Sequence, residues 1–419
     1  MEKCSWGFLK GHALMKICLV GFVCQPDGAT EAGIAWNWAL GYTELGHQVT
    51  VLTHNSQKSF FGLSEDSSSS FHSFNGIKIV FIGSESKKPV APTSLKSMNR
   101  MFRSYRKWQK TASKEIMNRE FDFIHHVSWS TCRSKSAFLT RAETVVWGPL
   151  GGGHFAKIRN VPTKDKIYEL FRNWSIQFSK IAYFGNRMST RNNVIALATN
   201  TATYSYLKSI GLQDVRYELA DGIQRVLPNK PWREFPLDTP IKLIWAGRII
   251  ASKRPDLAVS VLEELRTIGF DTTLTFLGEG NFLPNLLESI AKSEQRSRIE
   301  VLGQVTWEES VHAIANSDFL VFTSVRDSSC PAVLEAASFG VPTLGLRING
   351  LKDFFPNTFV LGPTKLTDDR SFASELGEQL VQFLKSDGWN SCHDNAVIFA
   401  ESHLWRTKAS RLIEMVDSK

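Results

Sequence analysis

Short apolar runs of strand length alternate with longer segments of helical periodicity along the first half of the chain. The first run is Lys16–Val23, and a Pro-Asp-Gly turn separates it from a helix that we expect from about Glu31 to Leu45. Gly46 ends this helix, and the run 47–53 follows as the next strand. This order predicts a β-α-β unit with two parallel strands.

Further runs of the same kind continue the pattern. They are Ile77–Gly83, Phe121–Val127, Thr144–Pro149 and Val194–Asn200. The segments between them are long enough to cross back as helices, so the pattern predicts a parallel, doubly wound sheet. The serine-rich stretch 64–76 predicts a mobile polar loop or an insertion rather than core.

A second series of strand-length runs begins after the proline-rich stretch 227–240, which we interpret as an interdomain linker. Its runs are 241–248, 273–280, 299–305, 319–325 and 341–346. Two α/β sheets side by side predict a cleft between the carboxyl ends of both sets of strands, where ligands of such folds bind. The predicted division is a tail (1–14), a first domain (15–220), a linker (221–240), a second domain (241–395) and a closing helix (396–419).

The composition agrees with a globular protein of two domains. Of the 419 residues, 42% are hydrophobic and 21% are charged, and no apolar run approaches the length of a membrane span. The six cysteines are scattered and form no C-x-x-C pair, which predicts a reducing cytoplasm and no zinc site.

The net charge of +8 is concentrated between Lys87 and Arg119, where aromatic residues interrupt a series of cations. One interpretation is a solvated helix face whose aromatic side chains pack on the core. The other is a surface for an anionic membrane or for an acceptor that carries phosphate. No nucleic-acid reader motif accompanies the charge, so nucleic acid is not an expected partner.

Two segments of the second half carry candidate chemistry. A strand that ends in Gly247 is followed by Arg248 and Lys253, and two cations at a strand end suit a diphosphate. Pro331 is typical of a first helical residue, and the free N–H groups of that helix could bind phosphate oxygens.

Two carboxylates accompany this helix start. Glu335, about one turn into the helix, could reach the hydroxyls of a ribose, and Asp327 could meet a sugar. The alternative is ordinary surface cations beside a solvent-exposed glutamate.

These segments resemble the motifs of glycosyltransferase family 4. The spacing from Asp327 to Glu335 resembles its E-x7-E motif, and GRIIASKRPD resembles its GR-x-x-x-x-K segment. FLGEG and IEVLGQV resemble its glycine loop and the strand that leads to its nucleobase pocket. The closing SHLWRTKASRLIEMV resembles its Ser-x-x-Trp helix, which packs back on the first domain.

The resemblance implies a GT-B fold, which has two Rossmann-like domains, and a nucleoside-diphosphate sugar as co-substrate. It implies sugar transfer with retention of configuration and without an essential metal or cofactor. Arg248 and Lys253 would hold the diphosphate, Glu335 the ribose, and Asp327 the sugar. The full set of nucleotide-sugar residues implied is Gly247, Arg248, Lys253, Gly278, Gly303, Ser329, Cys330, Pro331, Ala332 and Glu335. Two features depart from the family pattern: Asp327 replaces a glutamate, and Ser328-Ser329 replace Gly-Phe.

The first half resembles the family more loosely. Gly28 and Glu31 match its G-G-x-E start and would lie on the acceptor side of the cleft, together with Gly151 and Gly152. The glycine run 151–153 predicts either a phosphate-binding nest or a hinge.

The histidine that many relatives have at the end of one first-domain strand is displaced or absent here. His154 is one candidate to replace it. His125 and His126 end another strand toward the cleft, and since neighbours alternate, one of them must point into the core.

Other functions remain open. The chain has no Asp-x-Asp triplet for a metal-chelating transferase and no G-x-G-x-x-G turn for a nicotinamide dehydrogenase. A catalytically silent nucleotide-sugar-binding scaffold, and an epimerase or phosphorylase on the same fold, are the alternatives. The basic segment and the later stretch 166–188 favour a peripheral enzyme on the inner face of a membrane, acting on a sugar or lipid-linked saccharide acceptor.

Overall fold

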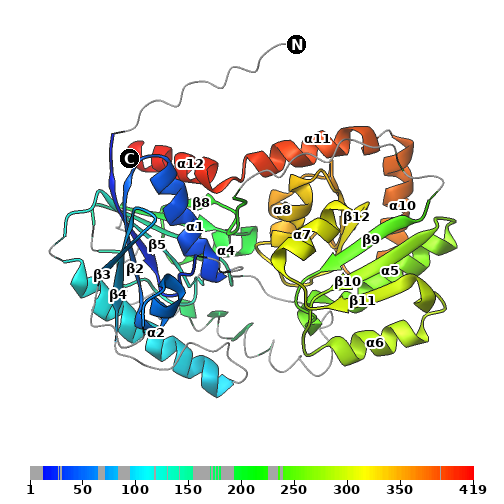
Figure 1. Cartoon of the computed structure of the whole chain (residues 1–419), viewed down its shortest axis with the longest axis horizontal. Helices are drawn as coiled ribbons and strands as arrows, with labels where there is room; N and C mark the ends of the chain where they lie inside the picture. The colour runs from blue at the N-terminus through cyan, green and yellow to red at the C-terminus, as the bar shows by residue number, and fades with distance from the viewer. Residues whose placement is uncertain are drawn as a thin grey trace, which may run out of the picture.

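The protein folds into two α/β domains that lie side by side (Figure 1). The computed structural model describes residues 13–26, 28, 31–64, 71–83, 95–117, 119–129, 131–140, 142–153, 170, 173–174, 176–177, 179–180, 193–224, 235, 239–386 and 388–419, with only the backbone for 95–99 and 128. His154 and most of the predicted linker lie outside these ranges.

The first domain is built on an eight-stranded sheet in the order β3-β4-β2-β1-β5-β6-β7-β8. Its strands are β1 (Lys16–Gly21), β2 (Gln48–His54), β3 (Phe71–Phe74), β4 (Ile77–Ile82), β5 (Phe123–Ser128), β6 (Thr144–Leu150), β7 (Val194–Ala198) and β8 (Asp214–Tyr217). Neighbouring strands are parallel except for β3, which pairs antiparallel with β4. The order reverses on either side of β1, so the prediction of a doubly wound sheet is confirmed.

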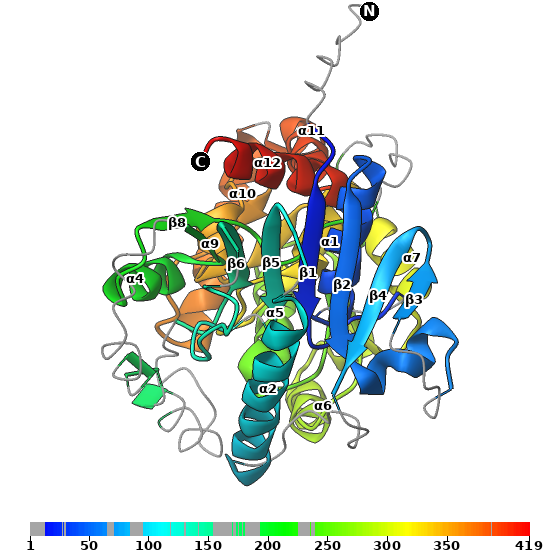
Figure 2. The same ribbon diagram turned by 90° about the vertical axis from the view of Figure 1, so that its left-hand side faces the viewer.

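Both faces of this sheet are covered by helices. Alternate residues of β1 enter different apolar clusters: Ile17 and Leu19 pack with α1 (Glu31–Glu44) and α12 (Trp405–Asp417). Cys18 and Val20 pack with Tyr105 and Trp108 of α2 (Leu95–Glu115) on the opposite face (Figure 2). Tyr105 and Trp108 of the basic segment therefore pack on the core, while the cations described between Arg100 and Lys114 are exposed. A further helix, α4 (Thr201–Ser209), packs beside β7 and β8.

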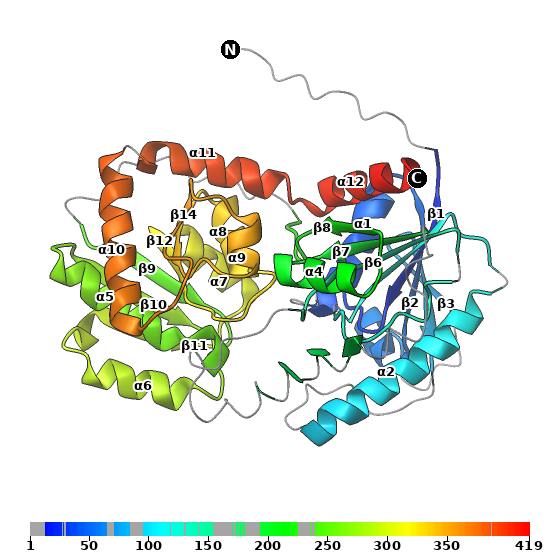
Figure 3. The same cartoon turned by 180° about the vertical axis from the view of Figure 1, so that it is seen from behind.

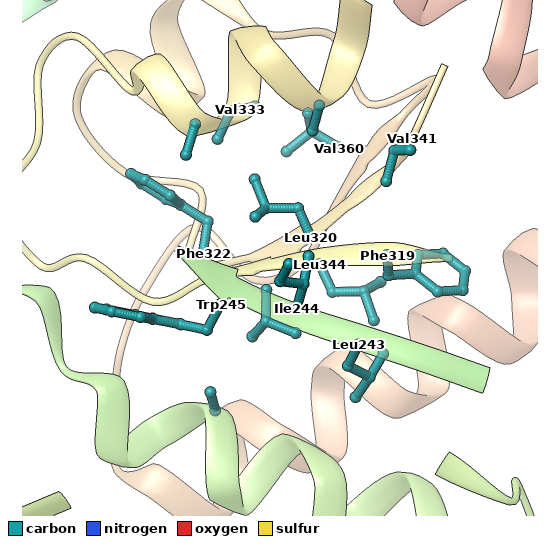
Figure 4. Close-up of a cluster of buried hydrophobic side chains, with 14 of the residues drawn as sticks. Leu243, Ile244, Trp245, Phe319, Leu320, Phe322, Val333, Val341, Leu344 and Val360 are labelled. Atoms are coloured by element: carbon teal, nitrogen blue, oxygen red, sulfur yellow. The ribbon is translucent and has the colours of Figure 1, made fainter. Parts of the chain in front are cut away.

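The second domain has an all-parallel sheet in the order β11-β10-β9-β12-β13-β14. Its strands are β9 (Ile241–Ala246), β10 (Thr272–Leu277), β11 (Ile299–Gly303), β12 (Phe319–Phe322), β13 (Thr343–Gly345) and β14 (Val360–Leu361). Its helices are α5 (Pro255–Thr267), α6 (Leu283–Lys292), α7 (Trp307–Ala315), α8 (Pro331–Ser338), α9 (Gly350–Phe354), α10 (Asp369–Lys385) and α11 (Gly388–Glu401). The apolar runs read from the sequence form its core, where Leu243 and Trp245 of β9 lie near Phe319 and Leu320 of β12 and Val333 of α8 (Figure 4).

The chain crosses between the domains twice, and the two crossings are bonded together. The first crossing, which we call the crossover, comprises residues 218–224, and the second comprises residues 402–404. Ile223 N donates to His403 O (3.1 Å), and Trp405 N donates to Ile223 O (3.0 Å). α11 packs on α8 of the second domain and α12 packs on α1 of the first (Figure 3). The closing helix expected from 396 is thus two helices, with the break at Ser402–Leu404.

Three edge strands were not predicted. β3 lies within the stretch interpreted as a polar loop, of which residues 65–70 are outside the described ranges. β8 in the first sheet and the two-residue β14 in the second had no counterpart in the pattern. In the described part of the chain, no helix has both the length and the apolarity that a bilayer crossing requires.

Candidate functional site

Glycines end neighbouring strands at one edge of the second sheet. Gly247, Gly278 and Gly303 follow or close β9, β10 and β11 with φ angles of +148°, +121° and +74°. Gly247 N donates to Leu277 O (3.0 Å) and Gly278 N donates to Gly303 O (2.7 Å). A Cβ on Gly278 would lie 2.0 Å from Gly247 O, so only glycine permits this approach. The edge presents backbone rather than side chains.

Lys253 lies over this edge. It ends the short 3-10 helix η5 (Ala251–Lys253), and its Nζ would be 2.9 Å from a Cβ on Gly247. Thr323 fixes this helix to the end of β12, because its hydroxyl donates to Lys253 O (2.9 Å) and accepts from Trp245 Nε1 (3.0 Å). The ammonium is 3.8 Å from Asp327 Oδ2. Arg248, the other predicted cation, follows Gly247 with an exposed side chain.

Asp327 shapes the loop that precedes α8, which we call loop 327–330. Its Oδ1 accepts from Ser329 N (3.1 Å) and Cys330 N (3.2 Å). Cys330 is buried with a φ of +49°, and Pro331 and Ala332 begin α8 as predicted. Asp327 was expected to meet a sugar. In the structure its two oxygens are engaged by the loop and by Lys253.

Glu335 lies on α8 one turn after Pro331. Its Oε1 accepts from the indole Nε1 of Trp307 (3.0 Å), which begins α7. Burial raises the pKa of Glu335, and the nearby charges of Asp221 and Lys253 act on it in opposite directions. The charge of Lys253 therefore acts on the Glu335 carboxyl, and a shared nucleotide-sugar site for the two residues stays a prediction. Trp307 was not foreseen.

Asp221, on the crossover, is a second residue that the sequence did not single out. It is buried, and its backbone oxygen accepts from Lys408 Nζ of α12 (2.8 Å). Burial, together with the charge of Asp327, raises its pKa to about 6. It was assigned only to a linker, and no motif marks it.

The first domain contacts loop 327–330 directly. Asn200 Nδ2 donates to Ser328 Oγ (2.9 Å), and Thr201 N donates to Asp353 Oδ2 on α9 (2.6 Å). Asn200 is itself fixed, since it caps the start of α4 by accepting from Thr203 N (2.8 Å). The loop that carries Asp327 is thus held from both domains.

The histidines of β5 do not face the cleft. His125 Nδ1 accepts from Tyr42 OH (2.8 Å), and its Nε2 is 2.8 Å from Gly148 O. His126 is likewise bonded at both ring nitrogens, by Tyr105 OH (2.8 Å) and Ser136 Oγ (2.6 Å). Burial lowers the pKa of His125 to about 3. The expectation that His125 lies on the acceptor side is wrong, because helices cover both faces of the sheet at β5.

The predicted acceptor-side glycines make close backbone contacts. A Cβ on Gly33 would lie 2.0 Å from Gly28 O, so the turn before α1 packs against the first turn of the helix that Glu31 begins. Gly151 pairs with Thr131 as an isolated bridge, and Gly152 has a φ of +86° beside it. These contacts are structural, and an acceptor role for the glycines stays a prediction.

No group of three or more His, Cys, Asp or Glu side chains in the described ranges is arranged to hold a metal ion. The cations of the second domain are the groups available to an anionic ligand.

A pocket lies at the opposite edge of the second sheet, at the amino ends of β9–β11. Its volume is about 520 Å³, and Lys242 and Arg298 are among its lining residues.

Residues 228–394 match the family model described as Glycosyl transferases group 1. One component of the phosphatidylinositol N-acetylglucosaminyltransferase of Arabidopsis thaliana is 24% identical over 213 residues, which are 51% of this chain and 47% of the relative. The GPI3 component of the corresponding Saccharomyces cerevisiae transferase is 21% identical over 275 residues, 62% of this chain and 57% of the relative. The chain thus matches about half the length of these curated relatives.

Solved structures align over almost the whole chain. HepE of Anabaena in complex with UDP and glucose has a TM-score of 0.56 at 12% identity, covering 97% of this chain and 100% of that one. WaaG, a glycosyltransferase involved in lipopolysaccharide biosynthesis, has a TM-score of 0.57 at 13% identity, covering 96% and 100%. The chain therefore has the GT-B fold, and the match to the glycosyl transferases group 1 model lies mostly in its second domain.

Proposed function

We propose that this protein is a retaining, metal-independent glycosyltransferase of family 4 that moves a hexose from a nucleoside-diphosphate sugar to an acceptor hydroxyl. The observation that carries the proposal is the placement of Lys253 over the glycine edge, beside loop 327–330 and in the same electrostatic environment as Glu335. These groups are a cation for a diphosphate, a helix start for its oxygens and a carboxylate for ribose hydroxyls.

The expected chemistry is stabilisation of the leaving group. Negative charge grows on the diphosphate as the bond to the sugar breaks, and Lys253 and the start of α8 oppose that charge. The diphosphate would replace Asp327 as the partner of Lys253, which leaves Oδ2 of Asp327 for a sugar hydroxyl. The exposed Arg248 has the freedom to close on the phosphates. The departing phosphate oxygen then assists deprotonation of the acceptor on the same face of the sugar.

A panel of three nucleotide sugars tests this function: UDP-glucose, UDP-N-acetylglucosamine and GDP-mannose. Thermal shift measures their binding, and their hydrolysis is then measured in the presence of EDTA. We expect at least one member to bind and turn over, and transfer to give a product of unchanged anomeric configuration by NMR. Lys253→Ala should lower kcat/KM by about 10²–10³-fold, since it removes a charge that acts in the transition state. Lys242→Ala, at the opposite end of β9, is the matched control. A near-normal rate for Lys253→Ala would refute the site.

The acceptor side is supported by the exposed face of α2. The cations whose side chains are described on this helix lie in solvent: Arg100, Arg103, Arg106, Lys107, Lys110 and Lys114. Because Tyr105 and Trp108 are buried, this face offers charge rather than apolar insertion, which suits the headgroups of an anionic membrane. We propose a peripheral enzyme of polysaccharide or glycolipid synthesis on the cytoplasmic side of such a membrane, with a lipid-linked acceptor.

Co-sedimentation with vesicles tests this surface. Binding should need anionic lipid and fall as salt rises, and replacement of Arg103, Arg106 and Lys107 by glutamine should weaken it. Equal binding to purely zwitterionic vesicles would contradict the proposal.

One observation favours a second function. Both oxygens of Asp327 are engaged within the protein, which suits a scaffold that binds a nucleotide sugar without catalysis. Tight binding of a panel member with neither hydrolysis nor transfer would support the scaffold.

A further inference from the structure

The indole of Trp307 is bonded to Glu335 on the neighbouring helix. Its Nε1 donates to Glu335 Oε1 (3.0 Å), although the two residues are 28 positions apart along the chain. Trp307 begins α7, and Glu335 lies on α8, which contacts α7. The indole is 53% exposed, so it contributes little to the core, and its one polar atom is committed to Glu335.

The backbone of Trp307 is fixed close to the glycine edge of the second sheet. α7 begins with a capping box, in which Thr306 Oγ1 accepts from Glu309 N (3.2 Å) and Thr306 N donates to Glu309 Oε2 (2.8 Å). This helix start follows Gly303, whose oxygen accepts from Gly278 N (2.7 Å). The indole therefore begins near the carboxyl ends of β10 and β11 and reaches α8.

The bond from Trp307 occupies one oxygen of the Glu335 carboxyl and leaves the other available. Within the described ranges, Oε2 accepts no hydrogen bond and is not fully buried. Burial raises the pKa of Glu335, and the hydrogen bond from Trp307 acts in the opposite direction, toward the ionised form that only accepts. A carboxylate with one oxygen held and the other available suits the adjacent hydroxyls of a ribose.

We propose that Trp307 is a positioning residue of the nucleotide-sugar site, whose indole N–H holds one oxygen of Glu335 so that the other accepts from a ribose hydroxyl. Without this bond the carboxylate would sample several rotamers, and binding would have to order it. The preference of the site for ribose thus depends on a residue that does not itself touch the ribose. The inference rests on the proposed function, because it takes Glu335 as the residue that binds the ribose.

The preference for ribose over deoxyribose tests this role. Calorimetry gives dissociation constants for UDP and 2′-deoxy-UDP, and for GDP and 2′-deoxy-GDP, and the ratio within each pair measures the preference. Wild type should bind the ribonucleotide of one pair about tenfold more tightly, since the deoxy compound lacks a hydrogen bond to a charged group. Trp307→Phe keeps an aromatic ring and removes the donor, so it should reduce this ratio to about threefold or less. Partial unfolding would weaken both members of a pair alike and leave the ratio unchanged.

Further variants separate the N–H group from the ring. Trp307→Gln removes the ring and keeps an N–H donor of similar reach, so it should retain more of the ratio than Trp307→Phe. Glu335→Ala should abolish the preference, and the addition of Trp307→Phe should then have no further effect on it. Glu308→Ala, which changes the exposed neighbour of Trp307 on α7, is the matched control and should keep the wild-type ratio.

The outcomes distinguish the inference from the proposed function. An equal ratio for wild type and Trp307→Phe would overturn the inference alone. A ratio kept by Trp307→Phe and lost by Trp307→Gln would also overturn it, because the ring rather than the N–H group would then act. If wild type binds neither UDP nor GDP, or binds them without a preference for ribose, the proposed donor site is contradicted, and the inference with it.

Discussion

Gly278 is required by the backbone that faces it. Its φ is +121°, and a Cβ would lie 2.0 Å from Gly247 O, an atom that cannot move without breaking the strand ends apart. Gly269 also has a positive φ (+100°), but nothing lies within 4 Å of its Cβ position. An alanine at Gly278 would therefore have both an unfavourable backbone conformation and a steric clash, whereas an alanine at Gly269 would have only the unfavourable conformation.

We expect Gly278→Ala to lower the free energy of unfolding by about 3 kcal/mol or more, because it adds a clash to a strained conformation. Gly269→Ala, the control, should cost about 1 kcal/mol, which is the effect of the conformation alone. Urea unfolding followed by far-UV circular dichroism measures both. Equal losses for the two variants would mean that the strand ends yield to accommodate the methyl group.

The positions of the candidate site residues of the second domain could be predicted because each of them belongs to a pattern of nearby residues in the sequence. Lys253 comes seven residues after the end of β9, and Pro331 comes nine residues after the end of β12 and begins α8 as the sequence predicted. Asp221 and Trp307 were not predictable, because the loop or helix that each one contacts lies far along the chain. The prediction that His125 lies on the acceptor side failed for a related reason. Tyr42, which bonds its ring, comes from α1, and the pattern of a strand does not show which faces of the sheet the helices cover.

At the scale of elements, α12 attaches the end of the chain to the first domain through a buried ion pair. The side chain of Lys408 is fully buried, 3.0 Å from Glu218 Oε1, with Trp38 and Trp405 at 5.4 and 5.1 Å from its Nζ. Arg411 reaches the same carboxylate at 3.2 Å. The pair is supported by backbone oxygens, so removal of one member leaves the other charge without its partner.

Lys408→Met keeps the length of the side chain and removes its charge. We expect a loss of about 3 kcal/mol in the free energy of unfolding, because Glu218 stays buried with only Arg411 to balance it. The double variant Lys408→Met with Glu218→Gln should recover part of this loss. If the single variant is as stable as wild type in thermal unfolding, the ion pair does not hold α12.

Two of the three edge strands that the pattern missed have little apolar signal, and the third, β14, has only two residues. β3 alternates exposed and half-buried residues, and β8 buries only Val215, so neither has the run of hydrophobic residues that marked the central strands. Both are edge strands, with a partner on one side only. The break between α11 and α12 was missed because both helices continue the same periodicity while burying their faces in different domains.

At the scale of the whole molecule, buried neutral histidines make the fold sensitive to acid. Burial lowers the pKa of His125 to about 3 and that of His403 to about 4. The unfolded chain binds a proton at each of these positions below about pH 6.5, whereas the folded protein does not. Stability contributed by the neutral rings is therefore present above pH 6.5 and is lost as pH falls toward 4.

We expect the free energy of unfolding to fall between pH 6.5 and 4.5, with a slope of up to about 1.4 kcal/mol per pH unit for each histidine. His403→Gln should make the slope shallower by as much as one proton. His312→Gln, whose ring is exposed on α7, is the control. Urea titrations at several pH values give the slope directly, and an unchanged slope for His403→Gln would show that its ring is protonated in the fold.

The β-bridge between Ile223 and Leu404 brings together the two points at which the chain passes between the domains. The second domain is therefore inserted into the first, with its two ends next to each other. The chain leaves the first domain and re-enters it at neighbouring points, so two cuts there would release residues 224–403 as one continuous cassette. Recombination at these points would exchange the second domain between proteins and leave the first domain complete. Under the proposed function, such a chimera would take its choice of nucleotide from one parent and its choice of acceptor from the other.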